Sequence, residues 1–108
     1  MIEEVRLHKI KGVTMVPGRQ DNVKALIQGQ TLYFKAEPDN QYDPNAIKLF
    51  SDPNFTKELG YLDSLLMKEM IERGFGVDSV MVRSIGSATG NKASNWGANI
   101  MIVFKKEE

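Results

Sequence analysis

The stretch EPDNQYDPNAIKLF, residues 37–50, joins a demanding turn to a strand. Its first nine residues hold two prolines, two asparagines and three acidic residues around a single tyrosine. Proline fixes the backbone, and short polar side chains bond neighbouring backbone groups, so this composition predicts a turn. A strand over residues 46–50 is expected to follow, with Ile47 and Leu49 on one face.

Five further strands are predicted on either side of this stretch. Residues 4–14 alternate polar and apolar side chains, as in a half-buried strand with Val5 and Leu7 on one face. β-branched and aromatic residues also favour strands. The remaining predicted strands cover residues 30–36, 59–62, 78–85 and 98–105. A polar, glycine-rich loop over residues 86–97 joins the last two.

Two short helices are predicted from apolar residues at helical spacing. The first has Asp21 or Asn22 as its N-cap and ends at Gly29, and the second has Asp63 or Ser64 as its N-cap and ends at Gly74. Their apolar positions are Val23, Leu26 and Ile27 in the first, and Leu66, Met67, Met70 and Ile71 in the second.

The order of elements predicts a mainly β chain with two short helices, a β/α+β class. Six short strands fit a small six-stranded OB-like or SH3-like barrel, because closure removes exposed sheet edges. An open α+β sheet is the alternative. The length of 108 residues suits one domain over residues 1–108.

Composition narrows the possible functions. Fourteen basic and fourteen acidic residues give zero formal charge, so any nucleic-acid site has to be local. The chain has no cysteine and one histidine, His8, which leaves little for a metal centre or a catalytic triad. The beginning of the chain does not resemble a signal peptide, and no apolar run reaches the ~20 residues of a membrane helix, so a cytoplasmic protein is expected.

Two sites suggested by spacing fail on inspection. Acidic and amide residues alternate from Asp39 to Asn45 as in a calcium loop, but Pro44 stands where glycine is required and Phe50 where a bidentate glutamate is required. The run GSATGNKAS lacks the phosphate-loop spacing. We therefore expect no metal, no cofactor and no enzymatic activity.

Aromatic residues next to cations suggest binding instead. Tyr42 lies in the predicted turn, Tyr61 ends a strand, and Trp96 lies in a polar loop near Lys92. Such pairs stack on unpaired bases at ~1 to 3 kcal/mol per base. Taken singly, each ring is more often found covering the rim or the end of a core.

Three segments together resemble the HIRAN domain family: GRQDN at residues 18–22, EPDNQYDPNAIKLF, and ELGYL at residues 58–62. The resemblance implies an OB-related barrel that binds single-stranded DNA and captures its free 3′ end. Family members occur fused to helicases and as standalone bacterial or phage proteins, and this chain is similar to the standalone form.

By position, the resemblance assigns the family's site to the quoted stretch. Asn40 and Asp43 would hydrogen-bond the terminal nucleotide, with the Asp43 carboxylate accepting from the 3′-hydroxyl, and Tyr42 would stack on a base. A carboxylate repels phosphate, so it would reject a continuing strand. Tyr61 would line the pocket, and Trp96 falls in a region that can supply another stacking ring.

The chain also departs from the family pattern. Where DNA-binding members carry a basic residue and aromatics, this chain has Thr14, Met15 and Val16. At the start of the second helix, where a phosphate-contacting lysine is expected, this chain has Ser64. Lys68, one turn later, could substitute for that lysine. Together with zero net charge, these changes predict weak, salt-dependent DNA binding.

The leading hypothesis is a non-catalytic module for the 3′ end of single-stranded DNA, acting in DNA replication, repair or processing. A helicase or nuclease would be supplied in trans, and the oligomeric state is open. The nucleic-acid-binding residues would be Asn40, Tyr42, Asp43, Tyr61, Lys68, Lys92 and Trp96. The rival is an adaptor or self-associating domain in which the motif is only a turn, and it predicts a buried Tyr42.

Overall fold

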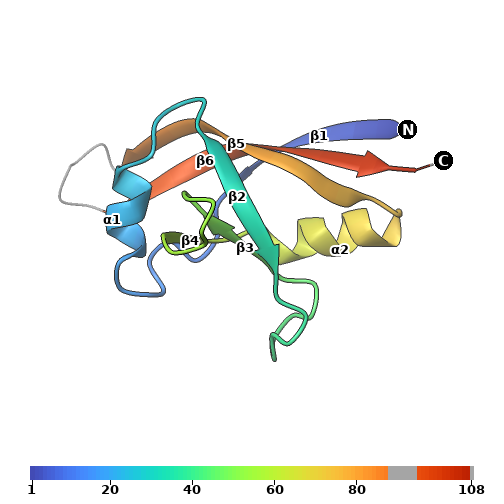
Figure 1. Ribbon diagram of the computed structural model, residues 1–108, viewed down its shortest axis with the longest axis horizontal. Helices are drawn as coiled ribbons and strands as arrows, with labels where there is room; N and C mark the ends of the chain where they lie inside the picture. The colour runs from blue at the N-terminus through green and yellow to red at the C-terminus, as the bar shows by residue number, and fades with distance from the viewer. Residues whose placement is uncertain (88–94, 108) are drawn as a thin grey trace.

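The computed structural model of the protein describes residues 1–87 and 95–107 and is mainly β (Figure 1). The elements in chain order are β1 (Ile2–Lys9), α1 (Arg19–Lys24), β2 (Thr31–Ala36), β3 (Ile47–Phe50), β4 (Glu58–Tyr61), α2 (Ser64–Glu72), β5 (Gly76–Ser87) and β6 (Trp96–Lys106). Lys92 lies outside the described residues, so its predicted role is not placed.

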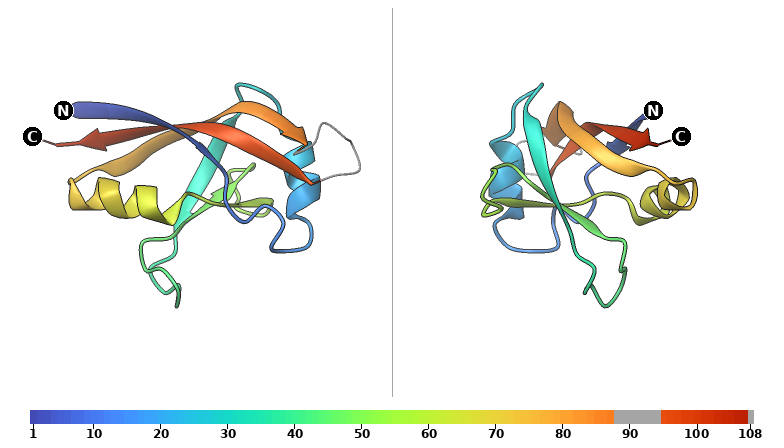
Figure 2. Two further views of the ribbon diagram at one scale, coloured as in Figure 1. Left: turned by 180° about the vertical axis from the view of Figure 1, so that it is seen from behind. Right: turned by 45° about the vertical axis from the view of Figure 1, so that its right-hand side comes forward.

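The strands form one antiparallel sheet in the order β1-β6-β5-β2-β3-β4. The sheet curls so strongly that its two ends meet (Figures 1 and 2). Just beyond β1, the Lys11 N–H donates to the Tyr61 carbonyl at 2.9 Å, and the Tyr61 N–H donates to the Lys11 carbonyl at 2.8 Å. The predicted small OB-like barrel is confirmed as a curled half-barrel joined by this Lys11–Tyr61 bridge.

Side chains from both helices and from all strands except β1 fill the core. The largest fully buried ones are Phe104, Leu49, Leu59, Met70, Ile100, Ile102, Val23, Val80 and Val82. Most of the predicted apolar positions of the helices are among the buried residues, whereas Ile27 and Ile71 are exposed. Neither described helix is long and apolar enough to cross a membrane.

The first strand differs from its prediction in length and in orientation. It ends at Lys9, because the chain turns at Gly12, where φ is +75°. Val5 and Leu7 do share a face, but that face is the exposed one, at 51% and 55% exposure. The polar face is the half-buried one, because Glu4 pairs with Arg73, the C-cap residue of α2.

The first helix also begins and ends earlier than predicted. Its N-cap is Gly18, at a φ of +92°, and neither predicted cap residue fills this role. The Asn22 amide instead donates to the Glu58 carbonyl at 2.9 Å. The helix stops at Lys24, and Gly29 instead donates its N–H to the Val82 carbonyl. Tertiary hydrogen bonds outweigh the local capping signals here.

The last two strands extend further toward each other than predicted. β5 runs to Ser87 and β6 begins at Trp96, so Trp96 is a strand residue rather than a loop residue. It pairs with Ser87 in the ladder. The polar composition of the predicted loop concealed these paired positions.

The second helix matches its prediction most closely. Asp63 is its N-cap, with the carboxylate accepting from the Leu66 N–H at 2.9 Å. This bond lowers the pKa of Asp63, against the opposing effect of burial, and the charges of His8 and Lys11 lower it further. A lowered folded-state pKa stabilises the fold above the unfolded-state value near 4, and this stabilisation is lost as the pH falls through the folded-state pKa.

Replacing Asp63 tests this cap directly. We expect Asp63→Ala to lower the free energy of unfolding by about 1 kcal/mol at neutral pH, measured by urea denaturation. The gap between variant and parent should narrow as the pH falls from about 5 to about 3, because the parent carboxylate becomes protonated. Asp63→Asn keeps a capping acceptor and should lose less. A gap that does not change over this pH range would contradict an ionised cap.

Candidate functional site

The loop between β2 and β3 is held in shape by its own polar side chains. The Asn40 side-chain oxygen accepts from the backbone N–H groups of Tyr42 at 2.9 Å and Asp43 at 3.0 Å. The Asn40 amide donates to Glu37 at 3.2 Å, and one Asp43 oxygen accepts from the Asn45 N–H at 2.9 Å. The quoted stretch is therefore a turn, as its composition predicted, and it is preformed.

Tyr42 projects from this turn with 96% of its surface exposed. The turn does not use its ring, and the neighbouring Asp43 carboxylate keeps a second oxygen with no hydrogen bond from the described residues. The rival prediction of a buried Tyr42 is wrong. The exposed ring and the free carboxylate oxygen are thus both accessible to a ligand.

A cleft of about 740 Å³ lies between this loop and the Lys11–Tyr61 bridge. The loop that forms one wall hangs from β2 and β3, away from the rest of the sheet (Figures 1 and 2). The lining residues are Lys11, Gly12, Met15, Val16, Arg19, Asn40, Tyr42, Asp43, Ala46, Tyr61, Leu62, Asp63 and Ser64. Four of the predicted site residues, Asn40, Tyr42, Asp43 and Tyr61, are thus brought together.

Tyr61 lies in the cleft with its hydroxyl already engaged. This hydroxyl donates to Glu37 at 2.6 Å. The Arg19 guanidinium and the Lys48 ammonium each lie 5.5 Å from the ring centroid, at cation–π distance. Burial, and then the hydrogen bond to Glu37, raise the pKa of Tyr61, so the phenol is neutral at physiological pH.

Charged groups beneath the cleft pair with one another. The Lys48 ammonium lies 3.2 Å from Glu37 and 3.6 Å from Glu58. Burial alone would raise the pKa of Glu37, but hydrogen bonds from Tyr61, Asn40 and Lys48 lower it. For Lys48 the signs are reversed: burial alone would lower its pKa, but the hydrogen bond to Glu37 raises it. Both side chains are therefore ionised, and the charges beneath the cleft balance one another. Glu37, Lys48 and Glu58 line an adjoining hollow of about 670 Å³ rather than the cleft itself.

Arg19 of α1 joins these charges to the cleft, which it lines. It is 4% exposed, and it donates to the Glu58 carboxylate at 2.8 Å and to the Gly12 carbonyl at 2.8 Å. Buried charges of this kind are stable only when they are paired and hydrogen-bonded. Arg19 therefore fixes Gly12, which lines the cleft, relative to the charges beneath it.

Lys68 lies next to the cleft rather than in it. It lines an adjoining depression of about 340 Å³ together with Tyr42 and Asp43. Within the described part of the chain, no ion pair engages it. An accessible cation thus stands on the outer side of the exposed tyrosine.

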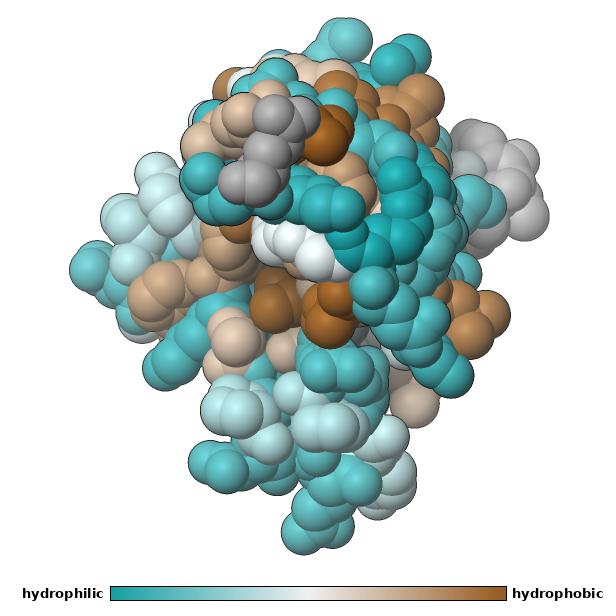
Figure 3. Space-filling model, turned by 90° about the vertical axis from the view of Figure 1, so that its right-hand side faces the viewer, coloured by the Kyte–Doolittle hydropathy of each residue, from teal (hydrophilic) through white to brown (hydrophobic). Residues whose placement is uncertain are grey.

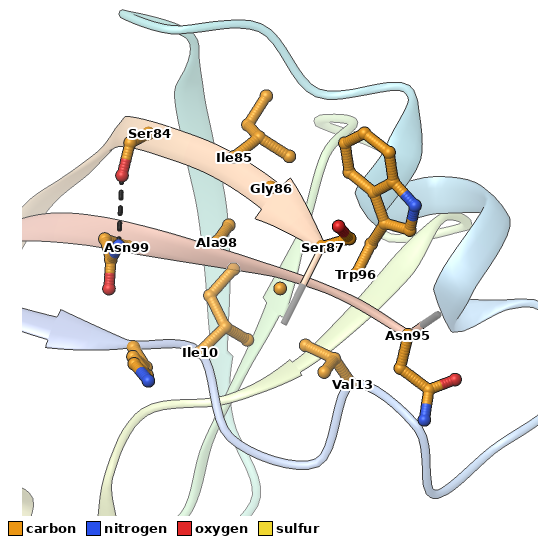
Figure 4. A pocket seen from close by; sticks show the side chains of 12 residues that line it. Ile10, Val13, Ser84, Ile85, Gly86, Ser87, Asn95, Trp96, Ala98 and Asn99 are labelled. Atoms are coloured by element: carbon orange, nitrogen blue, oxygen red, sulfur yellow. Dashed lines mark hydrogen bonds between the residues drawn. The ribbon is translucent and has the colours of Figure 1, made fainter. Parts of the chain in front are cut away.

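Trp96 lines a different hollow, of about 430 Å³. Figure 4 shows its indole beside α1, with Ile10, Val13 and Ile85 around the same hollow. The segment over residues 9–13 contributes to both hollows, with Lys11 and Gly12 on the cleft side. The structure thus does not bring Trp96 into contact with the predicted site around Tyr42.

Other residues of the site were not anticipated. Arg19 in the cleft, and the charged residues that pair behind it, carry no local sequence signal, since they meet only when β2, β3, β4 and α1 are assembled; the paired residues are Glu37, Lys48 and Glu58. Met15 and Val16, which replace the expected aromatics, line the cleft and are exposed. Their presence gives this wall an apolar, adaptable surface. No group of three or more potential metal ligands occurs among the described residues.

The comparison with protein families decides the identity. A family model described as HIRAN domain matches residues 8–95, which include both walls of the cleft. The chain belongs to the HIRAN domain family. No curated protein and no solved structure gave a significant match. HIRAN membership supports a nucleic-acid-binding role, and the sequence resemblance to this family is confirmed.

The structure also explains the first element of the HIRAN resemblance. In the GRQDN segment, Arg19 lines the cleft, and Gln20 ties α1 to β6 through the Trp96 backbone, accepting its N–H at 2.7 Å and donating to its carbonyl at 2.8 Å. Gln20 also donates to the Val13 carbonyl at 3.1 Å. Gln20 thus helps to assemble the HIRAN barrel, whereas Arg19 both braces the barrel and lines the cleft.

Proposed function

We propose that this HIRAN domain is a non-catalytic module that holds the 3′-hydroxyl end of single-stranded DNA in the cleft beside Tyr42. The observation that carries the proposal is the exposed Tyr42 ring next to the Asp43 carboxylate, in the motif that defines the family resemblance. Stacking on such a ring stabilises a bound base by ~1 to 3 kcal/mol. The size of the cleft, about 740 Å³, is in the range of small-molecule sites.

The roles of the loop residues follow from their remaining hydrogen-bonding capacity. The Asn40 side-chain oxygen already accepts two backbone N–H groups, so only its second amide hydrogen is left for a ligand. The Asp43 carboxylate can accept a hydroxyl proton through its second oxygen. Asn40 therefore acts mainly by shaping the loop, and Asp43 is the residue that distinguishes a 3′-hydroxyl from a 3′-phosphate.

Cations around the cleft determine the salt dependence of this function. Lys48 and Arg19 are compensated by Glu37 and Glu58, whereas Lys68 stands apart from such pairs. Phosphate contacts are therefore few, so binding should be weak, and its affinity should fall with salt only with the shallow slope that a few contacts give.

We infer that a helicase or nuclease acting on the DNA is supplied in trans, in replication, repair or processing.

Fluorescence anisotropy with matched oligonucleotides at low salt tests this function. The parent should bind a 3′-hydroxyl strand about tenfold more tightly than a 3′-phosphate strand, because the carboxylate repels the added charge. Asp43→Asn should bring the two affinities to within about threefold, since it removes that repulsion. Tyr42→Ala should weaken both by about fivefold or more, through the loss of stacking.

Two controls separate these effects from loss of fold. Asp39→Asn removes a carboxylate from the same loop that does not line the cleft, and it should leave the preference intact. Tyr42→Phe keeps the ring and should retain most of the affinity. Equal affinity of the parent for the two strands, or full affinity in Tyr42→Ala, would exclude the proposed mode of binding.

A further inference from the structure

The β1 strand leaves one edge of the sheet open. The Ile10 N–H, just beyond β1, donates to the Ala98 carbonyl at 3.0 Å. Backbone groups alternate in direction along an antiparallel strand, so the even-numbered residues of β1 face β6 and the odd-numbered ones face outward. The outward residues are Glu3, Val5, Leu7 and Lys9.

The N–H and C=O groups of these outward residues form no hydrogen bond within the described part of the chain, since β1 is the edge strand and pairs with β6 on its other side. The next outward residue, Lys11, is the one that bridges to Tyr61 of β4. The edge is therefore occupied at the bridge and open over residues 3–9. Figures 1 and 2 show β1 running along the margin of the sheet beside β6 to the N-terminus. A free edge of this length is a template for another strand.

The side chains of β1 make this edge rigid and partly apolar. On the inner face, Arg6 pairs with Glu69 of α2, and Glu4 pairs with Arg73. On the outer face, Val5 and Leu7 are more than half exposed. They lie beside Val103 and Met101 of β6, respectively. Hydrophobic residues are accordingly interspersed among hydrophilic ones on the face that holds the chain ends (Figure 3).

The charges of β1 are arranged so that the strand complements itself. We propose that β1 pairs antiparallel with β1 of a second copy of this chain, with Arg6 on the two-fold axis. This register places Glu3 opposite Lys9, Glu4 opposite His8, and Val5 opposite Leu7. Arg6 faces its own copy across the axis, where Glu4 and Glu69 of the same chain compensate its charge. All the outward backbone groups of both edges then find partners.

Neighbouring registers are less favourable. A one-residue shift opposes outward with inward backbone groups, so it fails to form the ladder. A shift that places Val5 on the axis opposes Glu3 to Leu7 and loses the pair with Lys9; it opposes Glu4 to Arg6, but both are already paired within their own chain. A shift that places Leu7 on the axis opposes Glu3 to Lys11, whose backbone is already engaged in the bridge. Charged residues on an edge strand usually prevent two sheets from associating. Here opposite charges face each other when Arg6 lies on the axis, so the charges favour that register. The outer apolar residues of both copies then form one continuous band across the joined sheet.

Charge reversal at Glu3 tests the register in the full chain. The parent should show a concentration-dependent dimer by sedimentation velocity, in the micromolar to millimolar range. Glu3→Lys should weaken the dimer by about tenfold, because two like-charged pairs replace two opposite ones. Adding Lys9→Glu should restore the affinity to within about threefold.

A matched control and a fold check accompany these variants. Asp21→Lys makes the same charge change on α1, at the far end of the molecule from the N-terminus, and should not alter association (Figure 1). Glu3 also pairs with Lys105 of its own chain at 3.5 Å, so the restoring double variant identifies the intermolecular pair. Circular dichroism should report the same fold in each variant.

A single cysteine provides an independent test, because the chain has none of its own. Arg6→Cys should form a disulfide-linked dimer on mild oxidation, since residues opposed on the axis lie within disulfide distance. Val103→Cys, one strand away from the edge, should not. A monomeric parent at all concentrations, a dimer unaffected by Glu3→Lys, or no cross-link through position 6 would each overturn the proposal. None of these positions lines the cleft, so the outcome is independent of DNA binding.

Discussion

Gly60→Ala should lower the free energy of unfolding by about 3 kcal/mol or more, the largest effect we expect from a single methyl group in this domain. A Cβ at this position would lie 2.2 Å from the Lys11 carbonyl oxygen and 3.0 Å from Ile10. That carbonyl accepts the Tyr61 N–H in the Lys11–Tyr61 bridge. The methyl group would force the two strands apart where the barrel closes.

The backbone of Gly60 adds a second cost. Its φ is +150°, a conformation that side-chain-bearing residues rarely adopt. Relaxation of the clash by moving the backbone would therefore have to break the bridge hydrogen bonds as well. Since Lys11 and Tyr61 both line the cleft, the variant should also lose DNA affinity in proportion to its loss of fold.

Urea denaturation of two variants makes this comparison. Gly86→Ala is the matched control, because a Cβ there meets no heavy atom within 4 Å and its backbone needs no positive φ. The control should change the free energy of unfolding by less than about 0.5 kcal/mol. Similar free energies of unfolding for the two variants would contradict this prediction, because they would show that the backbone near the bridge can accommodate the methyl group.

Glu58→Ala should lower the free energy of unfolding by about 3 kcal/mol, because it leaves the Arg19 charge buried without a carboxylate. Arg19 is 4% exposed, and after the substitution its described hydrogen-bond partner would be the Gly12 carbonyl. Glu58 is itself partly exposed, so we expect a loss at the lower end of the range for buried pairs.

A double-mutant comparison isolates the interaction between the two charges. Arg19→Met replaces the cation with an apolar side chain, and the double variant with Glu58→Ala should lose less than the sum of the single losses. Glu72→Ala, which removes an exposed carboxylate on α2, should change stability little. Strict additivity of the two substitutions would mean that Arg19 is held by other contacts.

Local signals in the sequence were sufficient for the elements whose stability is local. The α2 helix carries its own cap in Asp63 and its own stop in Gly74, so its position could be read directly. The strands after the turn follow the alternation of Ile47 and Leu49. In these regions the local preferences and the tertiary packing favour the same conformation.

The errors arose where distant residues determine the outcome. Alternation shows that Val5 and Leu7 share a face, but only the position of α2 shows that the opposite face is the covered one. Trp96 was placed in a loop because its neighbours are polar, whereas pairing with Ser87 makes it a strand residue. A single sequence contains no direct record of either arrangement.

The candidate site divides in the same way. The grouping of Tyr42, Asp43 and Tyr61 was accessible through the family resemblance, because a contiguous motif carries two of them. The pairing of Arg19 with Glu58 depends on how α1 lies against β4, so the sequence offered no sign of it. The conformation of the turn is explained by the side-chain oxygens of Asn40 and Asp43, which accept hydrogen bonds from backbone N–H groups of the same loop.

The Lys11–Tyr61 bridge also bears on the order in which the domain folds. The meander of β2, β3 and β4 joins strands close in the chain, whereas the bridge joins residues far apart and requires β1, β6 and β4 to be in place. Contacts between distant residues form late, because the entropy of loop closure must be lost before they stabilise. In a partly folded chain the loop that carries Tyr42 would lack the side of the cleft formed by Lys11 and Tyr61. We therefore expect the chain to bind DNA only after the bridge has formed.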